Sequence, residues 1–210
     1  MTNTSEKKYN FKLYPEEQHW WSFQDYQAVL NTMERLQPKQ VLEFGPGSST
    51  LALIEGGAAH IDTCEDAEDW AKVYEERLQG KYPEIVKLHR YTWSDPLSIP
   101  AIDLQQYDLA LVDGPLGTDR RPTVVRYCLE RCRAVLAPTE DRNRTFRATL
   151  QQIAGEYNWN IHITETGPLS GGFALFTPKG RGRSWGGFGS RSVQTPKPKA
   201  AQALAKEPQA

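Results

Sequence analysis

Short apolar runs and amphipathic segments alternate along the chain, and this alternation predicts its architecture. The apolar runs are near-continuous, as in strands that are buried on both faces of a parallel sheet. Most of them are separated by apolar residues at helical spacing. The last two follow one another without a helix, which predicts an antiparallel hairpin. The predicted strands are 40–44, 60–65, 84–91, 107–112, 134–137, 158–165 and 172–177.

The pattern therefore favours an α/β fold class with a doubly wound, mostly parallel sheet and a hairpin at one edge. A first helix is predicted to begin after Ser22, which resembles a capping box together with Asp25. For a chain of 210 residues, one domain is the expectation. We place this domain at 13–177, between a flexible N-terminus at 1–12 and a C-terminal tail at 178–210.

Composition changes this picture little. No stretch approaches the ~18 consecutive apolar residues of a membrane-spanning helix. The segment Met1–Lys12 lacks the apolar core of a signal peptide. The odd number of cysteines (Cys64, Cys128 and Cys132) favours reduced thiols in a cytoplasmic protein. A metal or redox pair at Cys128 and Cys132 is the alternative. We expect no membrane contact and a cytoplasmic location.

The charge of the chain is unevenly distributed. The whole chain has a net charge of −1, but 178–210 contains seven basic residues and one acid. This segment therefore has a charge of +6, and the remainder has −7. A segment so rich in Gly, Arg and Pro cannot bury enough apolar surface to fold, so we predict a disordered basic tail. Its arginines, with Trp185 and Phe188, could contact nucleic acid or a protein weakly. A solvated tail without a specific role is the alternative.

The stretch 41–53 combines an apolar run, a Gly-Pro-Gly turn and a second apolar run. It predicts a buried strand, a tight turn at Gly45 and Gly47, and a helix whose N-terminus faces the turn. The turn is not a phosphate-binding P-loop, which needs a Gly-Lys pair, and it lacks the third glycine of a dinucleotide fingerprint. It indicates a nucleotide-type site, and a plain strand-to-helix turn is the alternative. The hydroxyl residues expected to cap the helix are Ser48, Ser49 and Thr50.

Acidic and polar residues lie at or just beyond the ends of the five predicted parallel strands. Ligands of open α/β sheets bind beyond these carboxyl ends, so we expect these residues to meet there. An acid about 20 residues after the glycine turn is placed to accept hydrogen bonds from ribose hydroxyls. Each acid alone could be a solvated loop residue or a helix cap, and Asp66 is expected to cap the helix that follows it. Together, the residues at the strand ends favour a cationic or hydroxyl-rich ligand. They are Glu43, Glu65, Ser94, Asp95, Asp113 and Asp141.

These motifs resemble those of the class I S-adenosylmethionine-dependent methyltransferases over about residues 20–177. The segment Val41–Thr50 is similar to their first motif, acid-x-Gly-x-Gly-x-Ser, and Cys64-Glu65-Asp66 resembles the acid that ends their second strand. Leu111–Pro115, followed by Arg120-Arg121, is similar to a small subgroup of unassigned substrate. The resemblance implies a Rossmann-like, seven-stranded sheet of order 3-2-1-4-5-7-6, and S-adenosyl-L-methionine as the cofactor.

The resemblance also implies a role for each matching position. Glu43 would contact the amino end of the methionine moiety, Glu65 would bind the ribose hydroxyls, and Asp66 would flank the adenosine. Ser94 or Asp95 would lie near the adenine amine. The full set of implied cofactor-binding residues is Glu43, Gly45, Gly47, Ser48, Ser49, Thr50, Glu65, Asp66, Ser94, Asp95 and Asp113.

Methyl transfer from a sulfonium depends mainly on holding the acceptor in line with the methyl group. A base is needed only if the acceptor must lose a proton. Asp113, implied to lie beside the methyl donor, is the first candidate for that base, followed by His19 and Asp141. Some members of the superfamily bind a divalent cation through acids at the positions of Asp113 and Asp141. Here Arg142 stands in place of their asparagine and would repel the ion, so we expect no metal.

The sequence therefore predicts a methyltransferase whose acceptor is a small-molecule hydroxyl or amine. Two other hypotheses stay open. One is the transfer of a different group, such as aminopropyl, from a related cofactor. The other is a non-catalytic methyltransferase-like scaffold whose Arg/Gly tail binds RNA or a protein partner. Neither the acceptor nor the oligomeric state can be derived from these residues.

Overall fold

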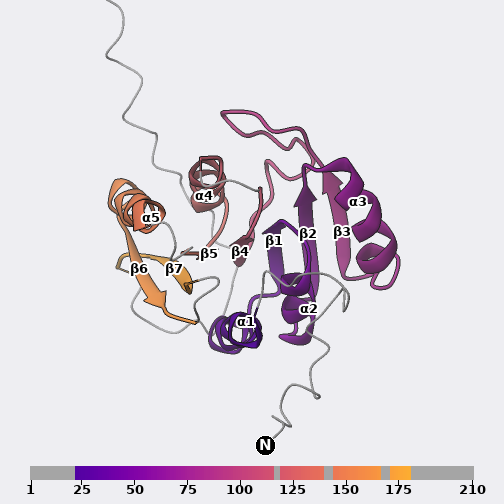
Figure 1. Ribbon diagram of the computed structural model, residues 1–210, viewed down its shortest axis with the longest axis horizontal. Helices are drawn as coiled ribbons and strands as arrows, with labels where there is room; N and C mark the ends of the chain where they lie inside the picture. Colours follow the sequence, from indigo (N-terminus) through magenta and orange to yellow (C-terminus); the bar gives the residue numbers. More distant parts are fainter. Residues whose placement is uncertain (1–21, 116–118, 140–143, 167–170, 181–210) are drawn as a thin grey trace, which may run out of the picture.

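The sheet at the centre of the protein has seven strands in the order β3-β2-β1-β4-β5-β7-β6 (Figure 1). The structure is a computed structural model that describes residues 22–115, 119–139, 144–166 and 171–180. Strands β1 to β5 pair in parallel, and β7 is antiparallel to both β5 and β6. The expected fold class and strand order are thereby confirmed. The strands are β1 (Gln40–Phe44), β2 (His60–Glu65), β3 (Val86–Arg90), β4 (Leu109–Val112), β5 (Val135–Pro138), β6 (Trp159–Thr164) and β7 (Phe173–Pro178).

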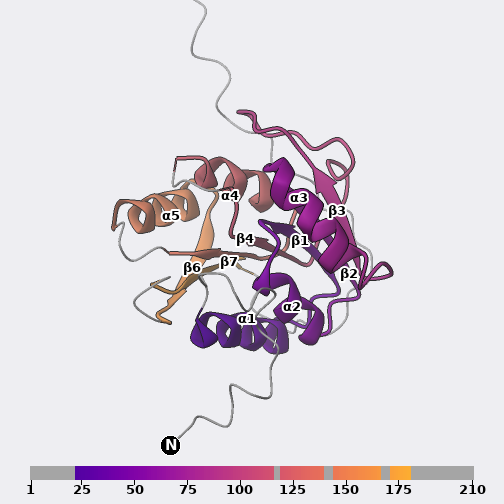
Figure 2. The ribbon, with the colours of Figure 1, turned by 45° about the vertical axis from the view of Figure 1, so that its right-hand side comes forward.

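Helices cover both faces of the sheet, as a doubly wound fold requires. Helices α4 and α5 lie on one face, and α1 and α2 lie on the other (Figures 1 and 2). Helix α3 is followed without a break by a short π-helix, Glu75–Gln79. The expected N-terminus at 1–12 and residues 181–210 of the expected tail lie outside the described residues. The helices are α1 (Phe23–Leu36), α2 (Ser48–Glu55), α3 (Glu68–Tyr74), α4 (Arg121–Leu129) and α5 (Arg144–Glu156).

The alternation of side chains along each strand divides the core into two layers. On the α4–α5 face, Leu42 and Phe44 of β1 pack with Val112 of β4. On the α1–α2 face, Val41 of β1 packs with Leu111 of β4. These side chains are almost fully buried, so the strands read as continuous apolar runs. The capping box predicted at Ser22 is confirmed: Ser22 Oγ accepts a hydrogen bond from the backbone N–H of Asp25 at 3.2 Å.

The connection between β3 and β4 contains no helix, although the structure describes all of its residues, 91–108. Its apolar side chains nevertheless fill the layer beneath α4, because Leu97, Ile99 and Ile102 are buried there. One polar clamp ties the connection to α4: Tyr127 donates a hydrogen bond from its hydroxyl to Asp103 at 2.8 Å. Apolar packing and this hydrogen bond therefore fix the position of the segment, which lacks the regular hydrogen bonds of a helix.

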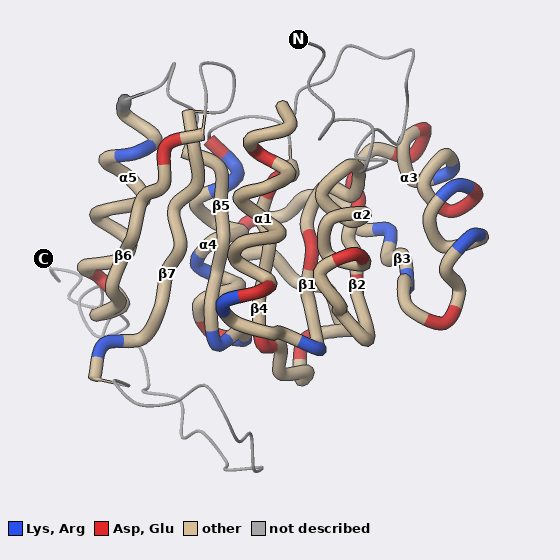
Figure 3. The backbone as a smooth tube through the Cα atoms, turned by 90° about the horizontal axis from the view of Figure 1, so that it is seen from below, with Lys and Arg blue, Asp and Glu red and all other residues tan. Residues whose placement is uncertain are grey.

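A buried acid, Asp62, lies in the middle of β2 on the same face as this connection. Its carboxylate contacts the Nε2 atoms of His60 and His89 at 2.9 and 2.5 Å, and it accepts a hydrogen bond from the Tyr107 hydroxyl at 2.9 Å. Burial alone would raise the pKa of Asp62, but the hydrogen bonds from His89 and Tyr107 outweigh it and lower the pKa. Acidic positions within β1 and β2 are visible as red segments in a largely uncharged sheet (Figure 3). The network joins β2, β3 and the residues before β4.

All three cysteines are free and buried, in agreement with the reduced thiols expected from the sequence. Within the ranges that the structure describes, no helix has the length and apolar character needed to cross a membrane.

Candidate functional site

The turn after β1 is packed directly against the turn after β4. Gly45 has a φ of +80°, and a Cβ at this position would lie 2.5 Å from the backbone nitrogen of Gly114. The backbone N–H groups of Asp113 and Gly114 both donate to the carbonyl oxygen of Phe44, at 2.9 and 2.7 Å. A residue with a side chain would therefore not fit at position 45, because the backbones of the two turns are in direct contact there. This contact places Asp113, expected beside the methyl donor, next to the glycine turn.

Gly47 could accept a Cβ without a clash, in contrast to Gly45. The nearest atom to a Cβ at Gly47 would be the Tyr74 hydroxyl at 3.9 Å. Gly47 is also the N-cap of α2, so none of the three predicted hydroxyl residues is the N-cap itself. The hydroxyl of Thr50 instead accepts a hydrogen bond from the backbone N–H of Gly47 at 3.0 Å. The glycine thus leaves room for a ligand at the helix N-terminus, where a free carboxylate is favoured.

Glu43 lies beneath the turn and is fully buried. Its carboxylate accepts hydrogen bonds from the hydroxyls of Ser49 (2.6 Å), Thr50 (2.7 Å) and Thr63 (2.9 Å). Burial raises the pKa of Glu43 to about 7; the three hydrogen bonds oppose this rise, and the charge of Asp113 adds to it. Ser49 and Thr50 are therefore used inside the protein to hold α2 against the sheet. Ser48, in contrast, is partly exposed.

The acid that ends β2 is positioned as the sequence predicted, at the carboxyl edge of the sheet. Glu65 is half-buried, and its Oε1 atom accepts a hydrogen bond from the backbone N–H of Ala67 at 2.8 Å. Burial and the neighbouring charge of Asp66 raise the pKa of Glu65, while the bond from Ala67 opposes them. The N-cap of α3 is Ala67 and makes no side-chain bond, so the prediction that Asp66 caps this helix was wrong. The Asp66 side chain faces α4 instead.

One arginine links the loops that follow three of the strands. Arg120, directly before α4, forms an ion pair with Asp66 at 3.7 Å. Its guanidinium also lies over the Trp93 ring, 5.5 Å from the ring centroid. Neither contact was predicted, because three separate loops meet there. Two residues with an implied role beyond β3, Ser94 and Asp95, are exposed in the same loop, and the Ser94 hydroxyl donates to the carbonyl of Pro96 at 3.1 Å.

Thr139, directly after β5, is a polar residue that the sequence reasoning missed. Its side chain is buried, and its hydroxyl has no hydrogen-bond partner among the residues that the structure describes. A buried polar group left unpaired costs about 1–3 kcal/mol, so such groups call for an explanation.

The two other candidate bases, His19 and Asp141, lie outside the described residues, as does Arg142. Within the described ranges, no group of three or more His, Cys, Asp or Glu side chains is placed to hold a metal ion.

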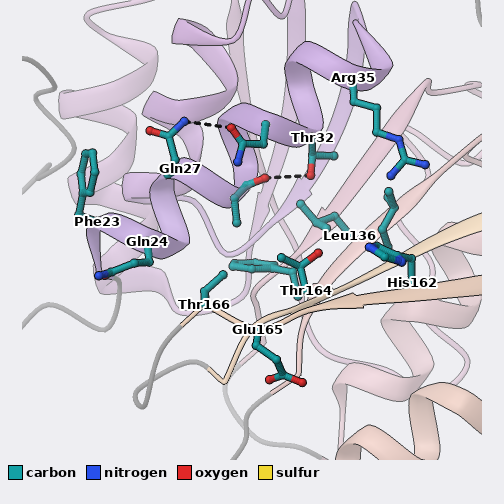
Figure 4. Close-up of a pocket in the computed structure, with 14 residues that line it drawn as sticks. Phe23, Gln24, Gln27, Thr32, Arg35, Leu136, His162, Thr164, Glu165 and Thr166 are labelled. Carbon is teal, nitrogen blue, oxygen red and sulfur yellow. Dashed lines mark hydrogen bonds between the residues drawn. The ribbon is translucent and has the colours of Figure 1, made fainter. Parts of the chain in front are cut away.

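Among the described residues, hollows in two parts of the molecule differ in their relation to the predicted site residues. One, of about 380 Å³, lies between α1 and the β6–β7 hairpin, with Phe23, Gln27 and Arg35 on one side and His162 and Thr164 on the other (Figure 4). None of the predicted site residues lines it. The other, of about 300 Å³, lies at the ends of β2 and β3, where Glu65 and Asp66 form part of its wall. The second hollow is therefore lined by two of the predicted cofactor-binding residues, Glu65 and Asp66.

Comparison with solved structures identifies the architecture. An O-methyltransferase from Bacillus cereus in complex with S-adenosylhomocysteine superimposes with a TM-score of 0.60 and 16% identity, covering 75% of this chain and 82% of that one. The chain has the class I methyltransferase fold. The magnesium protoporphyrin IX methyltransferase of Synechocystis PCC 6803, with bound S-adenosylmethionine, gives a TM-score of 0.54 and 15% identity over 78% of this chain and 86% of that one.

Sequence comparison adds no closer assignment for this methyltransferase-fold chain. No protein-family model matches it, and no curated protein does. At identities below 20%, the structural likeness establishes the fold alone, and the activity must be argued from the residues.

Proposed function

We propose that the protein is an S-adenosylmethionine-dependent methyltransferase that acts on a small-molecule hydroxyl or amine. The observation that carries this proposal is the arrangement of Gly47 and Glu65 at one edge of the sheet. Gly47, at the N-terminus of α2, has space for an added Cβ, and Glu65 ends the neighbouring strand beside a hollow of about 300 Å³. An amino-acid carboxylate suits the first position, and ribose hydroxyls suit the second.

The charges around the edge favour a cationic cofactor. Asp113 follows β4 and Glu65 ends β2, the two strands on either side of β1. The glycine turn after β1 contains no lysine or arginine. A sulfonium and an ammonium group would be attracted there, whereas a polyphosphate would be repelled. Both of the similar structures described above contain S-adenosylhomocysteine or S-adenosylmethionine, which supports the same choice.

The residues would act mainly by positioning. Bound S-adenosylmethionine supplies a methyl group on a good leaving group. Gly47 and Ser48 would hold the methionine end, and Glu65 would fix the ribose. Asp113 would orient the acceptor and, where the acceptor is a hydroxyl, would receive its proton.

Binding of the cofactor product tests the proposal without knowledge of the acceptor. We expect titration calorimetry to detect S-adenosylhomocysteine binding by the full chain. The proposal would be overturned if a folded protein gave no heat and no protection against thermal unfolding at millimolar ligand. Mass analysis of products then separates transfer of a methyl group from transfer of an aminopropyl group.

Substitution of Glu65 should weaken S-adenosylhomocysteine binding specifically. We expect Glu65→Gln to lower the affinity by about 1–3 kcal/mol, since a charged acceptor of ribose hydroxyls is lost. Glutamine keeps an oxygen that can accept from Ala67, so the start of α3 is preserved. Glu76→Ala removes an exposed acid beyond α3 and serves as the control for net charge. Equal calorimetric affinities for the Glu65 variant and the control would contradict the ribose role.

A further inference from the structure

The contacts of Arg120 join three strand-end loops on the α4 side of the candidate site. Asp66 follows β2, Trp93 follows β3, and Arg120 precedes α4 in the connection after β4. The guanidinium is 3.7 Å from the Asp66 carboxylate and 5.5 Å from the centre of the Trp93 ring. The Arg120 side chain remains 43% exposed, so one side of it is open to solvent.

The order of strands indicates which part of the cofactor would lie nearby. Going outward from the glycine turn after β1, the next strand is β2, which ends at Glu65, and the next is β3. A ligand with its amino-acid end at the turn and its ribose at Glu65 has its base next along this edge. Asp66 follows β2 and Trp93 follows β3. The base would therefore lie beside Arg120, which contacts both residues.

The stability of the fold does not account for this arrangement. Exposed ion pairs contribute little to stability, and the Arg120–Asp66 pair is long and partly exposed. The Asp66 carboxylate and the Trp93 ring contact the guanidinium from two different loops, so together they restrict where the Arg120 side chain can lie. A guanidinium held in this way can stack on an aromatic ring with little further loss of conformational freedom.

We propose that Arg120 is a specificity-determining residue of the cofactor site, whose guanidinium, held by Asp66 and Trp93, forms a stacking wall for the adenine ring. This inference rests on the proposed function and deepens it. The selected ligand class is an adenine nucleoside, and the recognition is by its π-face. A planar guanidinium is required for stacking, so lysine should not replace it.

The test measures S-adenosylhomocysteine affinity by calorimetry for the wild type, Arg120→Ala, Arg120→Lys and Arg126→Ala. Arg126 lies in α4, which follows Arg120, with a similar exposure of 36%, and it pairs with Glu156, so its variant controls for loss of a positive charge. We expect Arg120→Ala to bind about tenfold more weakly. Arg120→Lys should lose nearly as much, and Arg126→Ala should match the wild type. Circular dichroism verifies that each variant is folded.

Three results would overturn the inference while leaving the proposed function intact. They are unchanged or tighter binding by Arg120→Ala, full recovery by Arg120→Lys, and an equal loss in Arg126→Ala. The lysine variant alone decides the question if the alanine variant fails to fold. Absence of binding by the wild type is a different outcome, because it overturns the proposed function itself.

Discussion

Replacement of Gly45 by alanine is expected to destabilise the protein by about 3 kcal/mol. The new Cβ would lie 2.5 Å from the backbone nitrogen of Gly114 and 2.9 Å from its Cα, so one of the two turns must move. The φ of +80° adds strain for any residue with a side chain. Urea unfolding monitored by circular dichroism measures the change.

Two other glycines make this prediction specific. Gly155 in α5 has no neighbour within 4 Å of an added Cβ, so Gly155→Ala should not be destabilising. Gly47→Ala should also leave the unfolding free energy nearly unchanged, because only the Tyr74 hydroxyl lies near. It should nevertheless weaken S-adenosylhomocysteine binding, since the methyl group occupies the approach to α2. A Gly45 variant as stable as the Gly155 variant would refute the close-contact explanation.

Loss of the Asp62 carboxylate is expected to cost about 3 kcal/mol of unfolding free energy. Asp62→Ala leaves His60 and His89 without their shared acceptor, and both rings lie on strands that border the candidate site. Asp69→Ala, which removes an exposed acid of α3, should change stability by less than about 0.5 kcal/mol. A loss below 1 kcal/mol in urea unfolding of Asp62→Ala would show that the network contributes little.

The same residue gives the expected direction of acid sensitivity. Because the pKa of Asp62 is lowered in the folded state, its contribution is present above the ordinary pKa of 3.8 and is lost as the pH falls below it. Stability of the wild type should therefore fall more steeply in acid than that of Asp62→Asn. If the stability of the two proteins fell equally steeply with decreasing pH, the result would contradict this assignment.

Local sequence patterns were sufficient to predict the bounds of the two strands near the site. Both β1 and β2 begin and end at the predicted residues, because apolar runs bounded by turn residues define them well. The glycine turn and the acid at Glu65 were also predictable, since their spacing is contained within one β-α-β unit. The roles of these residues toward a cofactor remain predictions.

Contacts between distant segments explain what the sequence did not reveal. The hydroxyls of Ser49 and Thr50 were expected at a helix cap, but the buried carboxylate of Glu43 holds them. An acid inside an apolar strand, followed by hydroxyls in the next helix, was the available signal. Asp62 and Tyr107 are 45 positions apart, and only the pairing of strands brings them together.

The helix-free connection at 91–108 has a consequence for local unfolding. Its backbone has few regular hydrogen bonds, and its burial depends on a small set of apolar side chains and the Tyr127–Asp103 contact. Segments of this kind open at a lower free energy than the strands beside them. Amide protons of residues 91–108 should therefore exchange with solvent earlier than those of β1 and β4. The wall nearest the proposed adenine position would then be the part of the site with the lowest free energy of opening.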